Sequence, residues 1–159
     1  MLPDEKNILL IGVGNAYRRD DGVGHFIVNQ IKSRGYEHVA YLNLKAEGID
    51  LIEHWKNFST VILFDAVSCT EKPGTVFRFE LPPDELPKNV FGCSTHAFNI
   101  ADAIHLARAL NQCPAKIVVF GIAGKDFETG QGLSQEVHSA ALTVTDQVQQ
   151  EIQHLVAQK

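Results

Sequence analysis

Three polar positions in this sequence have the residue types of a divalent-metal site. Asp21 lies in a glycine-rich loop, Asp65 follows a run of apolar residues, and His96 ends a short polar stretch. Two carboxylates and one imidazole form an O,O,N ligand set suited to a borderline ion such as Ni²⁺ or Zn²⁺, with positions left for water or substrate. The three side chains therefore predict an open metal site, provided that the fold brings them together.

Each of these residues also has an ordinary structural explanation. An aspartate at a helix start interacts favourably with the helix dipole, which accounts for one of Asp20 and Asp21 but does not require both. His96 alone could be a helix cap or a core residue. Asp65 is harder to explain in this way, because a carboxylate after residues 61–64, all apolar, is expected to be partly desolvated. Such burial is costly unless the carboxylate is paired or bound to a metal.

The loop at residues 12–24 begins with Gly-x-Gly, which is also how dinucleotide sites begin. The third glycine of that motif would fall at position 17, which is Tyr17. Asp20 and Asp21 would repel a pyrophosphate at the helix N-terminus. No Gly-Lys-Ser/Thr follows, so a Walker loop is excluded as well. The loop is therefore not expected to bind a nucleotide.

A thiol protease is an alternative use of the same region. Cys69 or Cys93 could act with His96 as the base. Neither cysteine lies at an expected helix N-terminus or in a basic setting that would favour the thiolate, which counts against this hypothesis. The other histidines lack partner spacing and are expected to be surface or satisfied residues, with only His138 expected near the site: His25, His38, His54, His105, His138 and His154.

Alternating strand and helix patterns are expected to position these residues. Apolar or alternating runs predict strands at residues 7–13, 38–44, 60–66 and 116–122, with an edge strand at 75–80. Helical periodicity predicts helices at 22–34, 48–56 and 97–110, the last capped by Ser94 or Thr95, and a final helix capped by Ser134. Residues 81–94, with three prolines, are expected to form an exposed loop.

This order of elements predicts a three-layer α/β/α sandwich over a single domain, residues 1–159. Its sheet should be mainly parallel and twisted, with about five strands, one of them an edge strand, and with helices on both faces. Ligands of such sheets bind beyond the carboxyl ends of the strands. Asp21, Asp65 and His96 are all expected there.

Composition narrows the class of protein. The formal net charge is -5 and no segment concentrates Lys and Arg, so there is no electrostatic case for a nucleic-acid partner. No apolar run approaches the ~20 residues of a membrane helix, and the polar N-terminus is unlike a targeting signal. The three cysteines contain no C-x-x-C pair, which argues against a disulfide framework and a structural zinc site. We expect a cytoplasmic protein and, since no clear apolar stripe is exposed, a monomer.

Taken together, these motifs resemble those of the nickel–iron hydrogenase maturation proteases. The resemblance covers residues 8–15, 20–24, 94–96, 118–121 and 132–134, and the strand end at Asp65. It implies that Asp21, Asp65 and His96 bind the metal and are catalytic. It also implies removal of a C-terminal extension from the hydrogenase large-subunit precursor after nickel insertion. The nickel recognised would be that of the precursor, and other divalent ions such as zinc or cadmium could occupy the site.

One segment departs from the family pattern. Many relatives carry Asp-Gly-Gly-Thr after the second strand, whereas this chain differs from Leu44 to Gly48 and keeps only the glycine. The departure leaves the class of hydrogenase open. Two other functions also remain open: a metal-dependent peptidase or hydrolase with another substrate, and a non-catalytic nickel-binding or precursor-docking module.

Overall fold

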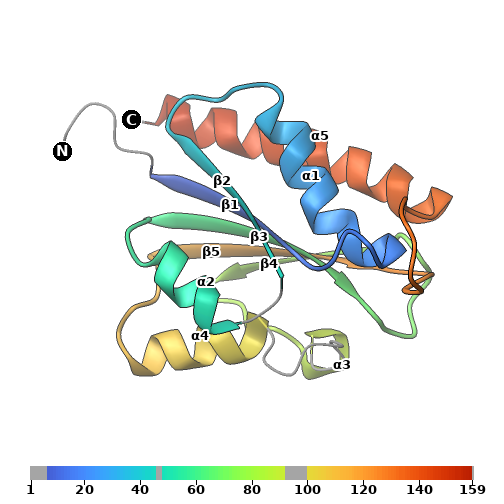
Figure 1. Ribbon diagram of the computed structural model, residues 1–159. Coiled ribbons are helices and arrows are strands. Elements are labelled where there is room, and N and C mark those ends of the chain that lie inside the picture. Colours follow the sequence, from blue (N-terminus) through green and yellow to red (C-terminus); the bar gives the residue numbers. More distant parts are fainter. Residues whose placement is uncertain (1–6, 46–47, 92–99, 159) are drawn as a thin grey trace.

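A computed structural model describes residues 7–45, 48–91 and 100–158. Five strands form one sheet in the order β2-β1-β3-β5-β4 (Figure 1). Their bounds are β1 Ile8–Val13, β2 Val39–Leu44, β3 Thr60–Val67, β4 Val76–Leu81 and β5 Lys116–Ala123. Strands β1, β2, β3 and β5 run parallel, and β4 pairs antiparallel with β5 at the edge. The prediction of a mainly parallel sheet with an edge strand is confirmed.

Helices cover both faces of this sheet (Figure 1). On one face lie α1 (Val23–Lys32) and α5 (Gln135–Ala157). On the other lie α2 (Gly48–Trp55), α3 (Lys88–Phe91) and α4 (Ile100–Ala109). The predicted three-layer sandwich is therefore confirmed. Within the described ranges, none of the helices has the length and hydropathy of a bilayer-spanning segment.

The side chains on the two faces of β3 pack into two separate hydrophobic cores. Ile62 and Phe64 pack with α1 and α5, whereas Leu63 and Val67 pack with α2 and α4. Successive strand side chains point to opposite faces, which is why a buried central strand reads as a continuous apolar run. By this alternation, Asp65 belongs to the face covered by α2 and α4.

The structure corrects the prediction of an exposed loop at residues 81–94. The short helix α3 begins directly after Pro87, and both Val90 and Phe91 are buried. The Phe91 ring meets that of Phe79 edge to face, with 5.9 Å between centroids. Proline is well tolerated at a helix start, so the prolines were compatible with this helix, which is too short to show periodicity. Residues 92–94 lie outside the described ranges.

Candidate metal site

Two glycines bring the start of α1 onto the carboxyl ends of β1 and β3. A Cβ added to Gly24 would lie 2.4 Å from the carbonyl oxygen of Phe64 and 2.9 Å from the amide nitrogen of Val13. One added to Gly12 would lie 2.5 Å from the carbonyl oxygen of Gly24. Only glycine permits such contacts between backbones. The glycine-rich motif therefore serves helix–sheet packing, which places the turn before α1 at the sheet edge.

That turn is the 3₁₀ helix η1 (Arg19–Gly22), which carries Asp21. The Asp21 side chain is buried, with 1% of the residue exposed. Its Oδ2 accepts a hydrogen bond from the Asn15 backbone N–H at 3.0 Å, and the Arg18 guanidinium lies 3.9 Å from the same oxygen. Gly14 has φ +137°, and a Cβ there would lie 2.0 Å from the Asp21 carbonyl oxygen. The loop backbone thus wraps closely around Asp21 and orients its carboxylate.

Asp65 lies in β3, where it pairs with Gly121 of β5. It is 3% exposed, and its Oδ1 has no hydrogen-bond partner among the described residues. Burial first, and then the negative charge of Asp21, raise the pKa of Asp65 well above its ordinary value, although the backbone N–H of Ala66 lowers it in part. The two carboxylates are therefore electrostatic neighbours. A cation beside them would offset the repulsion between the two carboxylates and would give the Asp65 Oδ1 a partner. This pair therefore fits a metal.

The structure therefore brings together two of the three predicted ligands, Asp21 and Asp65. The third, His96, lies outside the described residues, as do Cys93 and the proposed caps Ser94 and Thr95. Within the ranges that the structure describes, no three His, Cys, Asp or Glu residues are grouped as a metal site. Phe91, the last described residue before this segment, lies against Gly121, which neighbours Asp65 in the sheet. The assignment of His96 to the site stays a prediction.

Asp20 binds the loop between β5 and α5, a role that its sequence context did not indicate. It is completely buried, and its carboxylate accepts four hydrogen bonds from the loop between β5 and α5. The donors are the backbone N–H groups of Lys125 (2.8 Å), Asp126 (2.9 Å) and Ser134 (2.7 Å) and the Ser134 hydroxyl (2.9 Å). Burial alone would raise the pKa of Asp20, but these hydrogen bonds outweigh it and lower the pKa.

This arrangement also corrects the predicted capping bond of Ser134. Ser134 does occupy the N-cap position of α5, but its hydroxyl makes no capping hydrogen bond to that helix and instead donates to Asp20. The sequence marked Asp20 as polar and Ser134 as a cap, yet it held no signal that pairs them. Their separation of 114 residues explains why local reasoning missed the contact.

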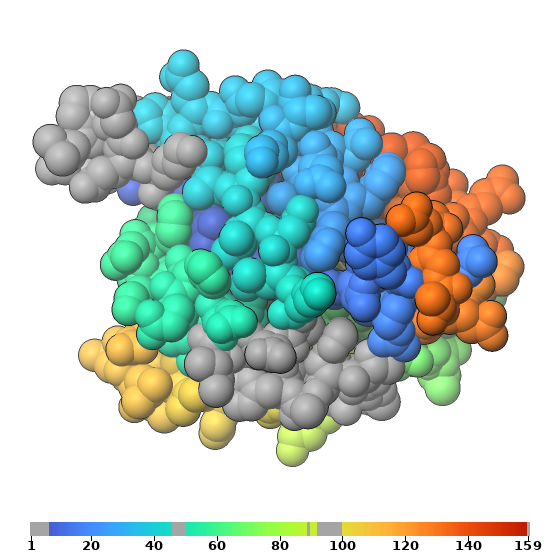
Figure 2. All heavy atoms as spheres, in the orientation of Figure 1, coloured from blue at the N-terminus to red at the C-terminus, as the bar shows by residue number. Residues whose placement is uncertain are grey.

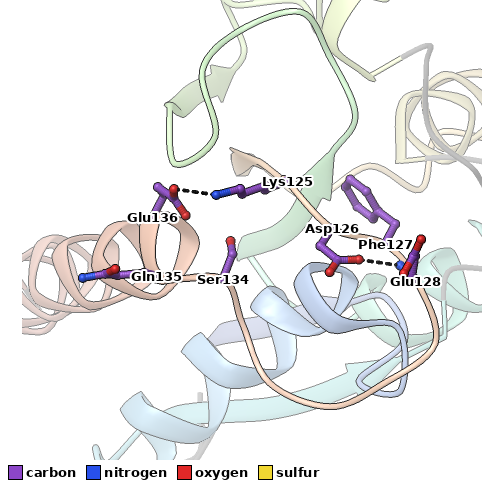
Figure 3. Close-up of a pocket in the computed structure, with 7 residues that line it drawn as sticks. All are labelled: Lys125, Asp126, Phe127, Glu128, Ser134, Gln135 and Glu136. Carbon is purple, nitrogen blue, oxygen red and sulfur yellow. Dashed lines mark hydrogen bonds and ion pairs between the residues drawn. The ribbon is translucent and has the colours of Figure 1, made fainter.

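The loop between β5 and α5 also borders a surface pocket of about 590 Å³ (Figure 3). In it, the Lys125 ammonium and the Glu136 carboxylate form an ion pair at 2.9 Å. Figure 2 shows the atoms of this loop, in orange, against those of the loop after β1, in blue. The pocket is lined by Lys125, Asp126, Phe127, Glu128, Ser134, Gln135 and Glu136.

Three of the remaining candidates have structural contacts, one of them His154, whose Nε2 lies 2.9 Å from the side-chain amide nitrogen of Gln158. His25 was predicted to be a surface or satisfied residue, and its Nε2 lies 3.1 Å from the carbonyl oxygen of Leu44. His138 packs its ring against Phe26, with 5.2 Å between centroids. Cys69 is a free, half-buried thiol.

Comparison with known proteins agrees with this fold. The model of the hydrogenase maturation protease family matches residues 26–151. The chain is 31% identical to a putative hydrogenase maturation protease of Methanocaldococcus jannaschii over 144 residues, which cover 86% of this chain and 90% of the relative. It is 28% identical to the hydrogenase 2 maturation protease of Escherichia coli over 146 residues, covering 89% and 87%.

Among solved structures, the hydrogenase maturating endopeptidase HybD of Escherichia coli superposes with a TM-score of 0.76, covers 92% of each chain and is 24% identical. The maturation protease HybD of Thermococcus kodakarensis gives a TM-score of 0.73 at 24% identity, covering 90% of this chain and 97% of its own. Sheet order, helix layers and sequence similarity thus agree, and the chain belongs to the hydrogenase maturation protease family.

Proposed function

We propose that this protein is an endopeptidase that removes the C-terminal extension of a nickel–iron hydrogenase large-subunit precursor after nickel has been inserted. One observation carries the proposal beyond family membership. Asp21 and Asp65 are both buried at the carboxyl edge of the sheet, and the charge of one raises the pKa of the other. Two such carboxylates are costly to keep together unless one is protonated or a cation joins them.

The nickel recognised is proposed to be that of the precursor. Two carboxylates with His96 as the third ligand form an incomplete coordination set, which leaves positions for groups of the substrate. The Asp65 Oδ1, unsatisfied within the described part of the chain, supports this idea because it offers an oxygen that no neighbouring donor has already engaged. A precursor without nickel would bring no cation to bind these two carboxyl groups, and so it would bind less well.

The two aspartates would contribute differently to hydrolysis. A nickel ion in the precursor would supply polarisation of the scissile carbonyl or of a water. The raised pKa of Asp65 suits a carboxyl group that takes a proton from the attacking water and passes it to the leaving amine, through the carboxylate oxygen that does not hold the metal. Asp21 is fixed by the Asn15 N–H and serves as an oriented ligand. No step requires a side-chain nucleophile.

The decisive experiment mixes the purified protein with nickel-loaded and metal-free large-subunit precursor. We expect cleavage of the loaded form alone, and equal rates for both forms would contradict recognition of nickel. Asp21→Ala, Asp65→Ala and His96→Ala should each abolish cleavage. Glu53→Ala, which removes an exposed ion pair between Glu53 of α2 and Lys56 just after that helix, should cleave normally. Normal cleavage by any of the three site variants would show that residue to be wrongly assigned.

The same assay separates the alternatives. A variant carrying both Cys69→Ser and Cys93→Ser should remain active, since no thiol takes part in the proposed reaction. Loss of cleavage in this variant, with folding intact, would instead indicate a cysteine nucleophile. Binding of the loaded precursor by the wild type without any cleavage would indicate a docking module.

A further inference from the structure

The turn that carries Asp21 is joined to the loop between β5 and α5 by the backbone. The Arg19 N–H donates to the Gly130 carbonyl at 3.0 Å, and the Gly130 N–H donates to the Tyr17 carbonyl at 2.8 Å. The Asp20 N–H donates to the Asp126 carbonyl at 3.0 Å. Because these bonds join two loops, and not two regular strands, the fixed position of η1 depends on how the loop between β5 and α5 is held.

The buried Asp20 carboxylate also joins the two loops, through hydrogen bonds of its side chain. Its Oδ1 accepts from the Ser134 N–H, and its Oδ2 accepts from Lys125 N–H, Asp126 N–H and the Ser134 hydroxyl. One buried side chain thus bonds both ends of the loop, at residues 125–126 and at residue 134. Hydrogen bonds to a charged group are roughly twice as strong as neutral ones. Because this carboxylate accepts four hydrogen bonds from the loop, it is not available to bind a metal or a substrate.

We propose that Asp20 is a positioning residue for its neighbour Asp21, locking the loop between β5 and α5 onto η1 so that the Asp21 carboxylate is held beside Asp65. The inference rests on the proposed function only in its consequence for catalysis. Consecutive Cα atoms are ~3.8 Å apart, so a shift of Asp20 moves Asp21 directly. A misplacement of about 1 Å at a reacting group can lower a rate about a hundredfold.

The contrary hypothesis is that Asp20 stabilises the fold alone. In that case, losing the carboxylate would loosen the loop between β5 and α5 but leave Asp21 where it is. The Asn15 N–H distinguishes the two hypotheses, because it donates to Asp21 Oδ2 at 3.0 Å and makes no bond to Asp20. Hydrogen exchange at the Asn15 amide therefore reports whether the Asp21 carboxylate remains in place.

The test measures amide hydrogen exchange by NMR in the wild type, Asp20→Asn and Ser134→Ala. Asp20→Asn should speed exchange at Lys125, Asp126 and Ser134 and also at Asn15, each about tenfold or more, as expected for the loss of charge-assisted bonds. Ser134→Ala removes the hydroxyl bond alone and should raise the same rates by about threefold. This milder variant keeps the test valid even where Asp20→Asn does not fold.

Glu136→Gln is the matched control, since it also replaces a carboxylate by an amide beside Lys125, but at a surface ion pair and not among the donors to Asp20. It should leave exchange at Asn15 unchanged. Faster exchange at Lys125 and Asp126 with an unchanged rate at Asn15 would overturn the positioning role, as would unchanged rates at all four amides. These outcomes are read without any substrate, so they stand even where the wild type fails to cleave the precursor. With an active wild type, Asp20→Asn should lower kcat about tenfold or more, and KM should change far less.

Discussion

Two adjacent aspartates in this protein differ because of their surroundings, not because of their sequence. Asp20 is saturated by donors from the loop between β5 and α5, which lower its pKa against the effect of burial. The charge of Asp21, after burial, raises the pKa of the Asp65 carboxyl. The donors to Asp20 lie 105 to 114 residues away, so a local motif could mark both residues as unusual but could not separate their roles.

The raised pKa of Asp65 predicts how stability depends on pH. Above the ordinary pKa of ~3.9, the unfolded chain releases the Asp65 proton while the folded protein retains it, so the folded state binds more protons. The contribution of Asp65 to the free energy of unfolding is therefore greatest below that pH. It is lost as the pH rises through the raised pKa. In metal-free protein, Asp65→Asn should remove this loss, which amounts to ~1.4 kcal/mol per pH unit for one proton.

Urea denaturation from about pH 4 to pH 8 measures this effect as the difference between wild type and variant. The free energy of unfolding of the wild type should fall relative to that of Asp65→Asn as pH rises. Asp146→Asn, at an exposed residue of α5, is the control and should show no such slope. A difference that is flat with pH would mean that Asp65 is not a buried carboxyl with a raised pKa.

At the scale of elements, periodicity predicted the regular segments but not the close contacts between them. Strands β3 and β5 and helix α5 follow directly from their apolar patterns. The glycine-rich motif indicated a loop of functional interest, while the contact of Gly24 with the sheet backbone appears only in three dimensions. Helix α3 was missed because its four residues are fewer than two turns and show no repeat.

Gly24→Ala is expected to destabilise the protein and to displace α1 from the sheet. The added methyl would lie 2.4 Å from the Phe64 carbonyl oxygen. This oxygen belongs to the backbone of a central strand, so it cannot move away as a flexible side chain could. Alanine favours helix by about 1 kcal/mol over glycine, but a backbone clash of this kind costs about 1–3 kcal/mol or more, so the clash should prevail. Chemical denaturation checks the free energy of unfolding. Lys32→Ala, on the exposed side of α1, should be nearly neutral, and a Gly24→Ala variant as stable as wild type would contradict the close packing.

At the scale of the whole molecule, the sequence determined the layers but not the strand order. Alternating strands and helices predicted a parallel sheet covered on both faces, and the structure confirms it. The order β2-β1-β3-β5-β4 depends on which strands pair across the sheet, which no local pattern contains. The same limit applies to the site. Residue types and strand ends predicted that Asp21 and Asp65 meet, whereas the place of His96 stays a prediction.

The single sheet between two cores predicts that the chain unfolds as one cooperative unit. Ile152 lies in the core between α5 and the sheet, and Ile104 lies in the core between α4 and the sheet. Both are buried, so Ile152→Ala and Ile104→Ala should each lower the free energy of unfolding by about 2–5 kcal/mol. Since β1, β3 and β5 contribute side chains to both cores, damage to either should weaken both.

In calorimetry and in denaturation followed by circular dichroism, each variant should therefore show one transition, shifted as a whole, with coincident probes. His105→Ala and Gln153→Ala, exposed on α4 and α5, are matched controls that should shift the transition little. Two separated transitions in either core variant would show that the helix layers unfold independently, and the chain would then not be a single folding unit. A single shifted transition would also mean that the site is stabilised by the whole sheet rather than by either helix layer alone. The same would hold for the two segments that form it, η1 and the loop between β5 and α5.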